Sequence, residues 1–367
     1  MARPVVGVLV RKNFFRNPKG LLFAQKLLQA NREDPCLIYF FPVENIDWIN
    51  KKIEGYVPGP RGGWRRGCYP FPDVLYDRGA GFGQNEMAAV EQIRRRLKNM
   101  PGIQLINACR LEKWPVYERL SRHKEMGRHL PKTIVFNGLP SVKLMLDRYG
   151  LVFIKSSEGS GGLGVICLEK KKQGYCCSLY KRGAHKRLLV KNLLELKKIL
   201  DPAVGRERKA IVQQGIRLVK YKGRRLDLRV LMVKDAKGEW KSVYNQARLA
   251  PEKAMITNLA LGGEVMNYAD ILPELRESYG DLPSDSEIRN ISSRIVHYIE
   301  KEFGPFGEIG LDLAVDESGR VWLLEANSKP SKLPEAGLED TVGISPQFKM
   351  TLDYTRFLFS GGKKGPP

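Results

Sequence analysis

Histidine and paired cysteines are scarce in this sequence, and their absence excludes several kinds of site. Among 367 residues there are 4 histidines and 6 cysteines. No two cysteines form a Cys-x-x-Cys pair, and the histidines lack the spacing of zinc sites. No stretch approaches the roughly 20 apolar residues of a membrane span, and the N-terminal apolar run is too short for a signal peptide. We therefore expect reduced thiols, a cytoplasmic location and no membrane partner.

Acidic residues are too few to balance the basic ones. The chain has 62 Lys and Arg against 40 Asp and Glu, which gives a net charge of +22. A surplus of this size indicates an anionic partner: phosphates, an acidic polymer, nucleic acid or an acidic surface. The Gly-, Pro- and Arg-rich segment 55–72 is compatible with an RNA-binding segment of the RGG type. Because it occurs in one copy and not as a repeat, we favour a basic loop beside the functional site.

Two β-rich stretches near the C-terminus predict a hairpin that carries a cation site. Residues 310–315 and 321–327 alternate in polarity, and Ser318-Gly319 is a suitable two-residue turn between them. This turn sets three pairs of residues opposite each other: Glu317 with Arg320, Ala314 with Leu323, and Asp312 with Glu325. Asn327 points to the same side as Glu325, so one face holds two carboxylates and an amide oxygen. Mg²⁺ prefers such ligands and would relieve the repulsion between the carboxylates, whereas the alternative is a merely solvated polar face.

A second predicted hairpin has a glycine-rich connection. Its first strand ends in Lys155, the connection contains Gly159-x-Gly161-x-x-Gly164, and a second strand follows at 165–169. A dinucleotide-binding fingerprint needs a helix after the glycines, and here a strand follows. The pattern therefore favours a loop that folds over phosphates and offers them its backbone N–H groups, with Lys155 as a point charge. A solvated glycine-rich hairpin with an incidental lysine is the alternative.

Two arginines lie on strands that the sequence predicts to be neighbours. Arg229 belongs to the stretch 227–233, and Arg248 lies near the end of the stretch 240–249. Guanidinium groups suit phosphoryl and carboxylate oxygens, but a lone arginine in a strand is usually a surface residue. The occurrence of two, close to the carboxylate hairpin, favours a functional interpretation. The strand 210–216 has a polar end, which suits a hinge that joins two lobes and presents backbone groups to a base.

The first 110 residues alternate between strands and helices, which is typical of an open α/β domain. Strands are expected at 4–10, 36–41, 73–78 and 103–106, and helices at 19–30 and 87–97. Further helices are expected over 111–130, 141–149, 190–200, 284–304 and 348–359, the fourth of which begins at a Ser284…Glu287 capping box.

The order of these features resembles the ATP-grasp superfamily over about residues 111–335. A helical lysine (Lys113), the Lys155 hairpin, the hinge strand, the two arginines and the Asp…Glu-x-Asn hairpin follow one another as in that superfamily. The resemblance implies an α/β (α+β) fold of two α+β lobes, preceded by a small open-sheet domain. Within the superfamily the chain is similar to the endospore-coat-associated YheC/YheD group, through residues 72–78, 130–133 and 258–263. The implied domains are 1–110 (pre-ATP-grasp α/β domain), 111–209 (small lobe with the glycine-rich hairpin), 210–359 (catalytic lobe) and 360–367 (disordered tail).

The resemblance also implies which residues serve the chemistry. ATP phosphates would be bound by Lys113 and Lys155 and covered by a loop that includes Glu158, Gly159, Ser160, Gly161, Gly162 and Gly164. Adenine would be held by Gln213, Gln214, Gly215 and Ile216. Two Mg²⁺ ions, or Mn²⁺ in their place, would be bound by Asp312, Glu325 and Asn327. The transferred phosphoryl group and the acyl-phosphate would be stabilised by Arg248 and Arg229.

The implied activity is that of an ATP- and Mg²⁺-dependent carboxylate–amine ligase, which forms an amide through an acyl-phosphate and releases ADP and phosphate. The basic surface suggests an acidic peptide or polymer as substrate. The subgroup suggests spore coat proteins as partners, and the mother-cell cytoplasm or the spore coat as the location. Nucleic acid is a disfavoured partner. Two alternatives stay open: an ATP-dependent phosphotransferase acting on a hydroxyl, and a basic, non-catalytic protein associated with the spore coat.

Two positions depart from the superfamily pattern. Gly310 stands where D-alanine:D-alanine-type ligases carry an arginine, and the Gln213-Gln214 pair replaces a glutamate often found in the adenine hinge. The first departure leaves the charge-stabilising role to Arg248 or Arg229. The second indicates altered hinge contacts and not a loss of ATP binding.

Overall fold

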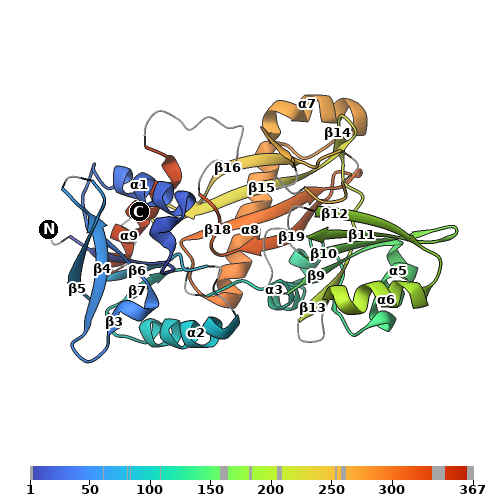
Figure 1. Cartoon of the computed structure of the whole chain (residues 1–367). Helices are drawn as coiled ribbons and strands as arrows, with labels where there is room; N and C mark the ends of the chain where they lie inside the picture. The colour runs from blue at the N-terminus through green and yellow to red at the C-terminus, as the bar shows by residue number, and fades with distance from the viewer. Residues whose placement is uncertain are drawn as a thin grey trace.

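The described residues form three β-sheets that follow one another along the chain, as the computed structural model shows (Figure 1). The structure describes residues 3–60, 62–80, 82, 84–107, 109–157, 164–181, 184–204, 209–252, 254–257, 262–332 and 344–361. Within these ranges, none of the helices has the length and the apolar composition that crossing a membrane requires. The expected mixed α/β fold is confirmed.

The first sheet is the open α/β unit expected from the sequence. Its strands β2, β1, β6 and β7 lie side by side and run parallel, as strands joined by helical crossovers do. The strands are β1 (Val5–Leu9), β2 (Leu37–Phe41), β3 (Ile46–Asp47), β4 (Lys52–Pro58), β5 (Trp64–Pro70), β6 (Val74–Asp77) and β7 (Gln104–Ile106). The helices in this part are α1 (Pro18–Ala30), α2 (Gln84–Lys98) and the short 3-10 turns η1 (Phe14–Arg16) and η2 (Val43–Asn45).

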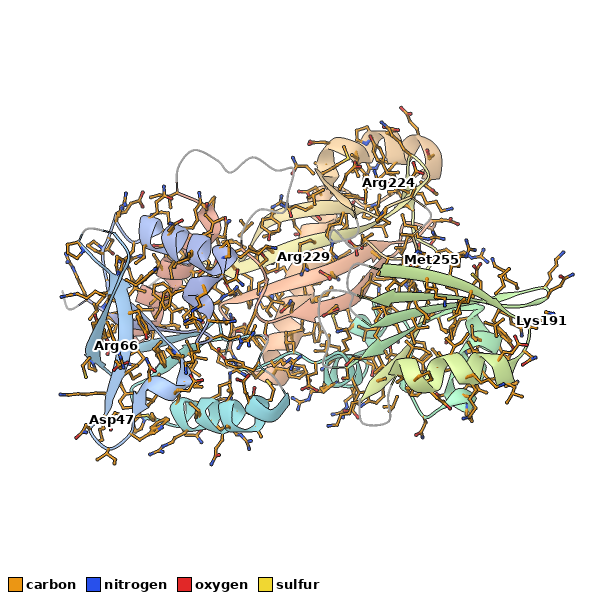
Figure 2. The ribbon with its side chains drawn as sticks, in the orientation of Figure 1. Asp47, Arg66, Lys191, Arg224, Arg229 and Met255 are labelled. Atoms are coloured by element: carbon orange, nitrogen blue, oxygen red, sulfur yellow. The ribbon has the colours of Figure 1, made fainter. Side chains whose placement is uncertain are left out.

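The basic segment 55–72 forms part of this sheet, so the expectation of a loop is wrong. Strands β4 and β5 pair as an antiparallel hairpin from Lys52↔Pro70 to Pro58↔Trp64. Alternate residues of β4 are buried, and Ile53 packs in the core of the sheet. Pairing of the backbone therefore overrides the Gly and Pro content. Figure 2 shows Arg66, on β5, well away from Arg229 of the third sheet, so the hairpin does not lie beside the predicted site.

The second sheet is antiparallel throughout, in the order β12-β11-β10-β9-β13-β8. Its strands are β8 (Thr133–Val135), β9 (Leu151–Ser156), β10 (Val165–Lys171), β11 (Gly174–Lys181), β12 (Ala184–Val190) and β13 (Ala210–Gln214). One face packs on the helices α5 (Leu139–Tyr149) and α6 (Leu193–Val204). Because side chains alternate along a strand, the other face carries a smaller apolar cluster of Val165, Cys167 and Tyr180.

The third sheet is also antiparallel, in the order β17-β16-β15-β18-β19, with β14 paired to β15. Its strands are β14 (Lys220–Tyr221), β15 (Arg224–Lys234), β16 (Trp240–Leu249), β17 (Glu264–Asn267), β18 (Glu308–Val315) and β19 (Val321–Asn327). The other helices are α3 (Lys113–Leu120), α4 (Lys124–Gly127), α7 (Tyr268–Tyr279), α8 (Asp285–Phe303) and α9 (Pro346–Phe359). The expected capping box of α8 is present, and α8 packs its apolar face against β15 and β16.

The domain limits inferred from the sequence stay predictions. The three sheets span residues 5–106, 133–214 and 220–327. Strand β13, at which the third predicted segment begins, pairs with β8 and β9 of the second sheet. Helix α9, near the C-terminus, packs back on the first sheet through Phe348 and Leu352.

The β18–β19 hairpin has the expected opposition of Asp312 and Glu325, reached through a different register. The turn pairs Val315 with Val321 and Ala314 with Trp322, one position off the predicted alignment. Its bend depends on Asp316, whose carboxylate accepts three hydrogen bonds from Ser318 and Arg320, and on Gly319 at φ +81°. An irregularity between Asp312 and Leu313 then restores the pairing of Asp312 with Glu325.

A buried ion cluster joins the first and third sheets. Glu308, at the start of β18, lies 2.6 Å from Arg78 Nη1 and 2.6 Å from Lys332 Nζ, and it accepts hydrogen bonds from Tyr76 and Asn107. Burial lowers the pKa of Lys332 to about 8, because loss of water disfavours its charged form. Burial alone would raise the pKa of Glu308, but Lys332 and Arg78 outweigh it and hold this pKa below its usual value.

We expect Glu308→Gln to lower the free energy of unfolding by about 3–5 kcal/mol, because it leaves Arg78 and Lys332 buried without a counter-charge. Urea-induced unfolding at pH 7 measures this change. Glu317 is exposed in the turn of the β18–β19 hairpin, so Glu317→Gln is a matched control that should leave stability unchanged. Equal stability of the two variants would contradict a stabilising role for the cluster.

Candidate active site

The centre of the candidate site is Asp312, which lies on β18 beside two arginines. Arg229, on β15, stands directly opposite it, and its Nη1 is 2.8 Å from Asp312 Oδ1. Arg248 reaches Asp312 from β16, one strand further away, with Nη2 3.2 Å from Oδ2. Burial acts to raise the pKa of Asp312, but Arg229 and Arg248 outweigh it, so this pKa lies below its usual value. The structure thus brings both predicted arginines to one predicted metal ligand.

The site contains one further carboxylate, Asp227, that is absent from the set expected from the sequence. Asp227 binds Arg248 through both oxygens, at 2.7 Å from Nε and 2.9 Å from Nη2, and it accepts a hydrogen bond from the Thr257 hydroxyl. Burial raises the pKa of Asp227, the nearby Asp312 adds to this rise, and Arg248 opposes it. A signal was present in the sequence, because Asp227 and Arg229 are two residues apart on one strand and share a face.

Gly310 makes room for Arg229. A Cβ atom at residue 310 would lie 3.0 Å from Arg229 Nη1 and 2.8 Å from Pro330 Cβ, which is closer than such contacts normally come. The guanidinium of Arg229 therefore fills the space that a side chain at 310 would need. The arginine that is absent from position 310 is matched by one that reaches the same place from the neighbouring strand.

Glu325 and Asn327 complete the predicted metal-binding set, and the residues fit a hard cation. Glu325 stands opposite Asp312 and lies 3.2 Å from Lys113 Nζ, and Asn327 Oδ1 accepts a hydrogen bond from the Lys329 backbone. Asp312 Oδ1 is buried and accepts no hydrogen bond, although Arg229 is near. Nowhere in the described ranges do three His, Cys, Asp or Glu side chains gather to hold a metal. The set here is two carboxylates and an amide, which are oxygen ligands that Mg²⁺ accepts.

The two predicted phosphate-binding lysines come from separate elements that meet at this site. Lys113 is the first residue of α3, and its backbone N–H donates to Ser157 O at 3.2 Å, just beyond the end of β9. Lys155, on β9, donates from Nζ to Gln213 Oε1 at 2.8 Å. Burial lowers the pKa of Lys155 to about 8, Glu325 opposes this shift, and Lys113 adds to it.

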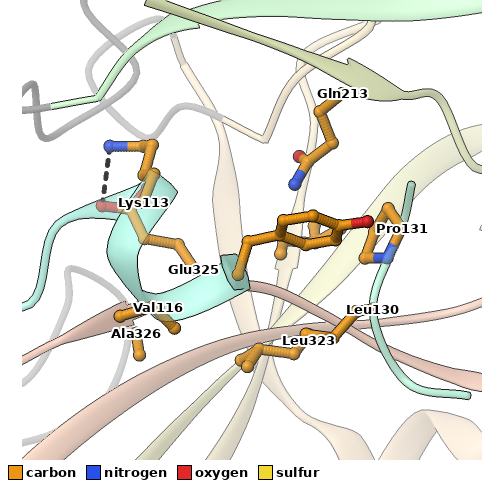
Figure 3. A pocket seen from close by; sticks show the side chains of 10 residues that line it. Lys113, Val116, Leu130, Pro131, Gln213, Leu323, Glu325 and Ala326 are labelled. Carbon is orange, nitrogen blue, oxygen red and sulfur yellow. Dashed lines mark ion pairs between the residues drawn. The ribbon is translucent and has the colours of Figure 1, made fainter. Parts of the chain in front are cut away.

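A pocket opens beside Lys113 (Figure 3). The Lys113–Glu325 ion pair lies at one side of it and Gln213 at another, while Leu130, Pro131 and Leu323 form apolar walls. The pocket lies between α3, β13 and β19, so elements of both the second and the third sheet line it. An apolar pocket with a few convergent polar groups is the usual form of a small-molecule site.

The predicted adenine hinge is only partly brought to this pocket. Gln213 lines it, whereas the N–H of Gln214 donates to Lys132 O at 2.8 Å and that of Gly215 donates to Leu151 O at 2.8 Å. Gly215 packs so closely on Leu151 that a Cβ there would lie 2.3 Å from Leu151 Cγ. These backbone groups already have partners within the protein. Contact of Gln214, Gly215 and Ile216 with adenine stays a prediction.

Part of the glycine-rich loop lies outside the described residues. This applies to Glu158, Gly159, Ser160, Gly161 and Gly162, as well as to residues 258–261 of the subgroup motif and to the tail from 362. Gly164 is described, has φ +71°, and donates its N–H to Tyr180 O at 3.0 Å. That φ value favours glycine at the point where the loop enters β10.

Relatives of the chain are known. A family model described as YheC/D like ATP-grasp matches residues 102–358. The chain is 26% identical over 318 residues to the endospore coat-associated protein YheD of Bacillus subtilis (strain 168), covering 85% of this chain and 68% of YheD. It is 23% identical over 303 residues to the endospore coat-associated protein YheC of the same organism, covering 81% of each protein.

Solved structures share the fold. D-cycloserine synthetase DcsG superposes with a TM-score of 0.59 at 14% identity, covering 98% of this chain and 100% of DcsG. The ATP-grasp ligase PsnB, solved with a phosphomimetic variant of a minimal precursor, Mg and ADP, gives a TM-score of 0.53 at 12% identity, covering 96% of this chain and 100% of PsnB. The ATP-grasp fold expected from the sequence is confirmed. Because the family model matches most of its length, the chain belongs to the YheC/D-like ATP-grasp family.

Proposed function

We propose that this protein is an ATP- and Mg²⁺-dependent carboxylate–amine ligase that works through an acyl-phosphate. The observation that carries the proposal is the grouping of Asp312, Arg229 and Arg248 beside the Lys113–Glu325 pair and its pocket. Such a grouping can bind a cation and stabilise the negative charge on the oxygens of a transferred phosphoryl group. Membership of an ATP-grasp family supports this chemistry, as does the shared fold of PsnB, which was solved with Mg and ADP.

In the proposed reaction, a carboxylate oxygen of the acid attacks the γ-phosphorus of ATP. The bond from that phosphorus to the bridging oxygen of ADP breaks, and an acyl-phosphate forms. An amine then attacks the acyl carbon, the phosphate leaves with the electron pair of the C–O bond, and the nitrogen loses a proton as the amide forms. The carboxylate needs this activation because its own oxygen is a poor leaving group, whereas phosphate is a good one.

The charged residues divide this work between them. Arg229 and Arg248 neutralise charge on the oxygens of the transferred phosphoryl group. Lys113 and Lys155 bind the phosphates that remain on ADP. Asp312, Glu325 and Asn327 would hold Mg²⁺, which would neutralise charge on the phosphate oxygens.

Glu325→Gln should reduce Mg²⁺-dependent turnover by about 100-fold or more, because the amide binds Mg²⁺ more weakly and leaves Lys113 without its counter-charge. Turnover is measured as hydroxamate formed from ATP, Mg²⁺, hydroxylamine and a panel of acids, namely glutamate, short polyglutamates and spore-coat peptides. Glu317→Gln, in the exposed turn of the same hairpin, is the control and should keep full turnover.

Two other outcomes would replace this proposal, and a third would change its metal site. A phosphorylated product without hydroxamate would indicate a phosphotransferase acting on a hydroxyl. Nucleotide binding without either product across the whole panel would indicate a non-catalytic binding protein. Full turnover in Glu325→Gln would remove Glu325 from the metal site.

The affinity for Mg·ATP should fall as the pH rises above about 8. Lys155 has a pKa of about 8 without nucleotide, and phosphate oxygens favour its charged form, so binding above this pH requires uptake of a proton. Below about pH 7.5 the lysine is already charged, and the affinity should be constant. Calorimetric titrations between pH 7 and 9.5 in buffers of different ionisation enthalpy measure both the affinity and the proton uptake.

Lys155→Arg is the matched variant for this titration, because a guanidinium stays charged throughout the range. It should bind Mg·ATP with little change between pH 8 and 9.5 and without proton uptake from this position. The same pH dependence in Lys155→Arg and in the unmodified chain would show that another group titrates.

We further propose that the substrate is an acidic peptide or polymer. Residues 1–110 hold 18 Lys and Arg against 9 Asp and Glu, residues 111–209 hold 22 against 9, and residues 210–367 hold 22 against 22. The whole positive surplus therefore lies in residues 1–209, and residues 210–367 carry no net charge. A surplus confined in this way favours attraction of an anionic chain over general solubility. The names of YheD and YheC, which describe both as endospore coat-associated, support a substrate in the spore coat.

Binding of poly-L-glutamate should weaken roughly tenfold or more between 50 and 300 mM NaCl, because added salt screens the attraction between exposed basic residues and the polymer. Fluorescence anisotropy of a labelled polymer measures the affinity. Poly-L-lysine of equal length is the control and should not bind. Affinity for poly-L-glutamate that is independent of salt would argue against electrostatic capture.

A further inference from the structure

Residues 254–257, which follow β16, connect the second sheet to the third. The backbone N–H of Met255 donates to the hydroxyl of Tyr180 on β11 at 2.8 Å. Met255 and Ile256 also pack on the apolar cluster that contains Val165 and Cys167. Figure 2 shows Met255 beside the strands of the second sheet. The segment 254–257 is thus seated on the face of that sheet that carries Lys155.

The same segment is fastened to β15 of the third sheet. Arg225 Nη1 donates to Ala254 O at 3.2 Å, and the hydroxyl of Thr257 donates to Asp227. Thr257 lies two residues after Met255, so displacement of one displaces the other. A span of three residues, 255–257, therefore joins the contact with Tyr180 to the contact with Asp227.

Asp227 in turn sets the direction of Arg248. Both oxygens of Asp227 are engaged by the guanidinium, and both side chains are buried, with 9% of each side chain exposed. Because the guanidinium is planar, this two-point contact fixes its orientation. Nη2 is then left 3.2 Å from Asp312 Oδ2, a longer contact than either bond to Asp227.

We propose that Asp227 is a positioning residue that fixes the orientation of Arg248 for its contact with the phosphoryl group. In this proposal, residues 254–257 make that orientation depend on the hydrogen bond between Met255 and Tyr180 of the second sheet. The inference rests on the proposed function, in which Arg248 meets the phosphoryl group. Without Asp227, Arg248 would turn fully onto Asp312 and occupy the oxygen that a cation needs. Without the Tyr180 contact, Thr257 would release Asp227, and the same loss would follow.

A double-mutant cycle on the full chain tests this coupling. Tyr180→Phe, Asp227→Asn and the combined variant are titrated with Mg·AMP-PNP, an ATP analogue, by calorimetry. Tyr180→Phe should weaken binding about 2- to 10-fold, because the Met255 N–H loses its partner. In the Asp227→Asn background the same change should have no further effect. Unchanged thermal midpoints would show that neither change acts through general stability.

Tyr175→Phe is the matched control for the loss of a hydroxyl. Tyr175 lies on the same strand as Tyr180 but packs on the opposite face of the sheet, among the residues that contact α5 and α6. It should bind Mg·AMP-PNP as the unmodified chain does. If Asp227→Asn does not fold, Thr257→Val takes its place, because it removes the bond to Asp227 and keeps the shape of the side chain.

The outcomes separate this inference from the proposed function. Tight binding of Mg·AMP-PNP with independent, multiplying effects of Tyr180→Phe and Asp227→Asn would overturn the coupling and leave the proposed ligase intact. An absence of binding to the unmodified chain would overturn the proposed function, and the positioning role with it. A weakened affinity in Tyr175→Phe equal to that of Tyr180→Phe would show that the effect is not specific to the Met255 contact.

Discussion

The balance of charge around Asp312 is the constraint on which the rest of the site depends. Asp227, Asp312 and Glu325 bring three negative charges to one region, and Arg229, Arg248, Lys113 and Lys155 bring four positive ones. The strands of the third sheet can carry the carboxylates and the two arginines on one face only because opposite charges are paired where little water reaches them. A cation alone or a nucleotide alone would disturb this balance, whereas the two together disturb it far less. In the proposed function, metal and nucleotide would therefore bind together.

Much of the fold followed from the sequence because its signals are local. The capping box of α8, the hairpin of β18 and β19, and the open α/β arrangement of the first sheet were all expected from short patterns, and all are present. The segment 55–72 was misjudged because Gly and Pro suggested a loop, while the pairing of β4 with β5 depends on backbone bonds that composition does not reveal. The opposition of Asp312 and Glu325 was correctly expected, although the turn and the irregularity that produce it were not.

The candidate site shows the same division between local and distant signals. Motif residues such as Lys155, Arg248 and Asp312 were singled out because each has chemistry that suits phosphate or metal. Asp227 was not, because its importance arises from contacts with Arg248 and Thr257, which are 21 and 30 residues away along the chain. The compensation between Gly310 and Arg229 is likewise visible only when two strands are placed side by side. What a pattern cannot predict is which residues share a space.

The ion cluster at Glu308 makes the first sheet a structural part of the site-bearing third sheet. The matched family model begins at residue 102, yet Arg78 and Tyr76, which hold Glu308, precede it, and Lys332 reaches the cluster from beyond β19. In a fragment limited to residues 102–358, Glu308 and Lys332 would lose Arg78 and Tyr76 and become exposed to solvent. The first and third sheets are thus joined by charges buried between them, and separating the sheets would leave these charges without their partners.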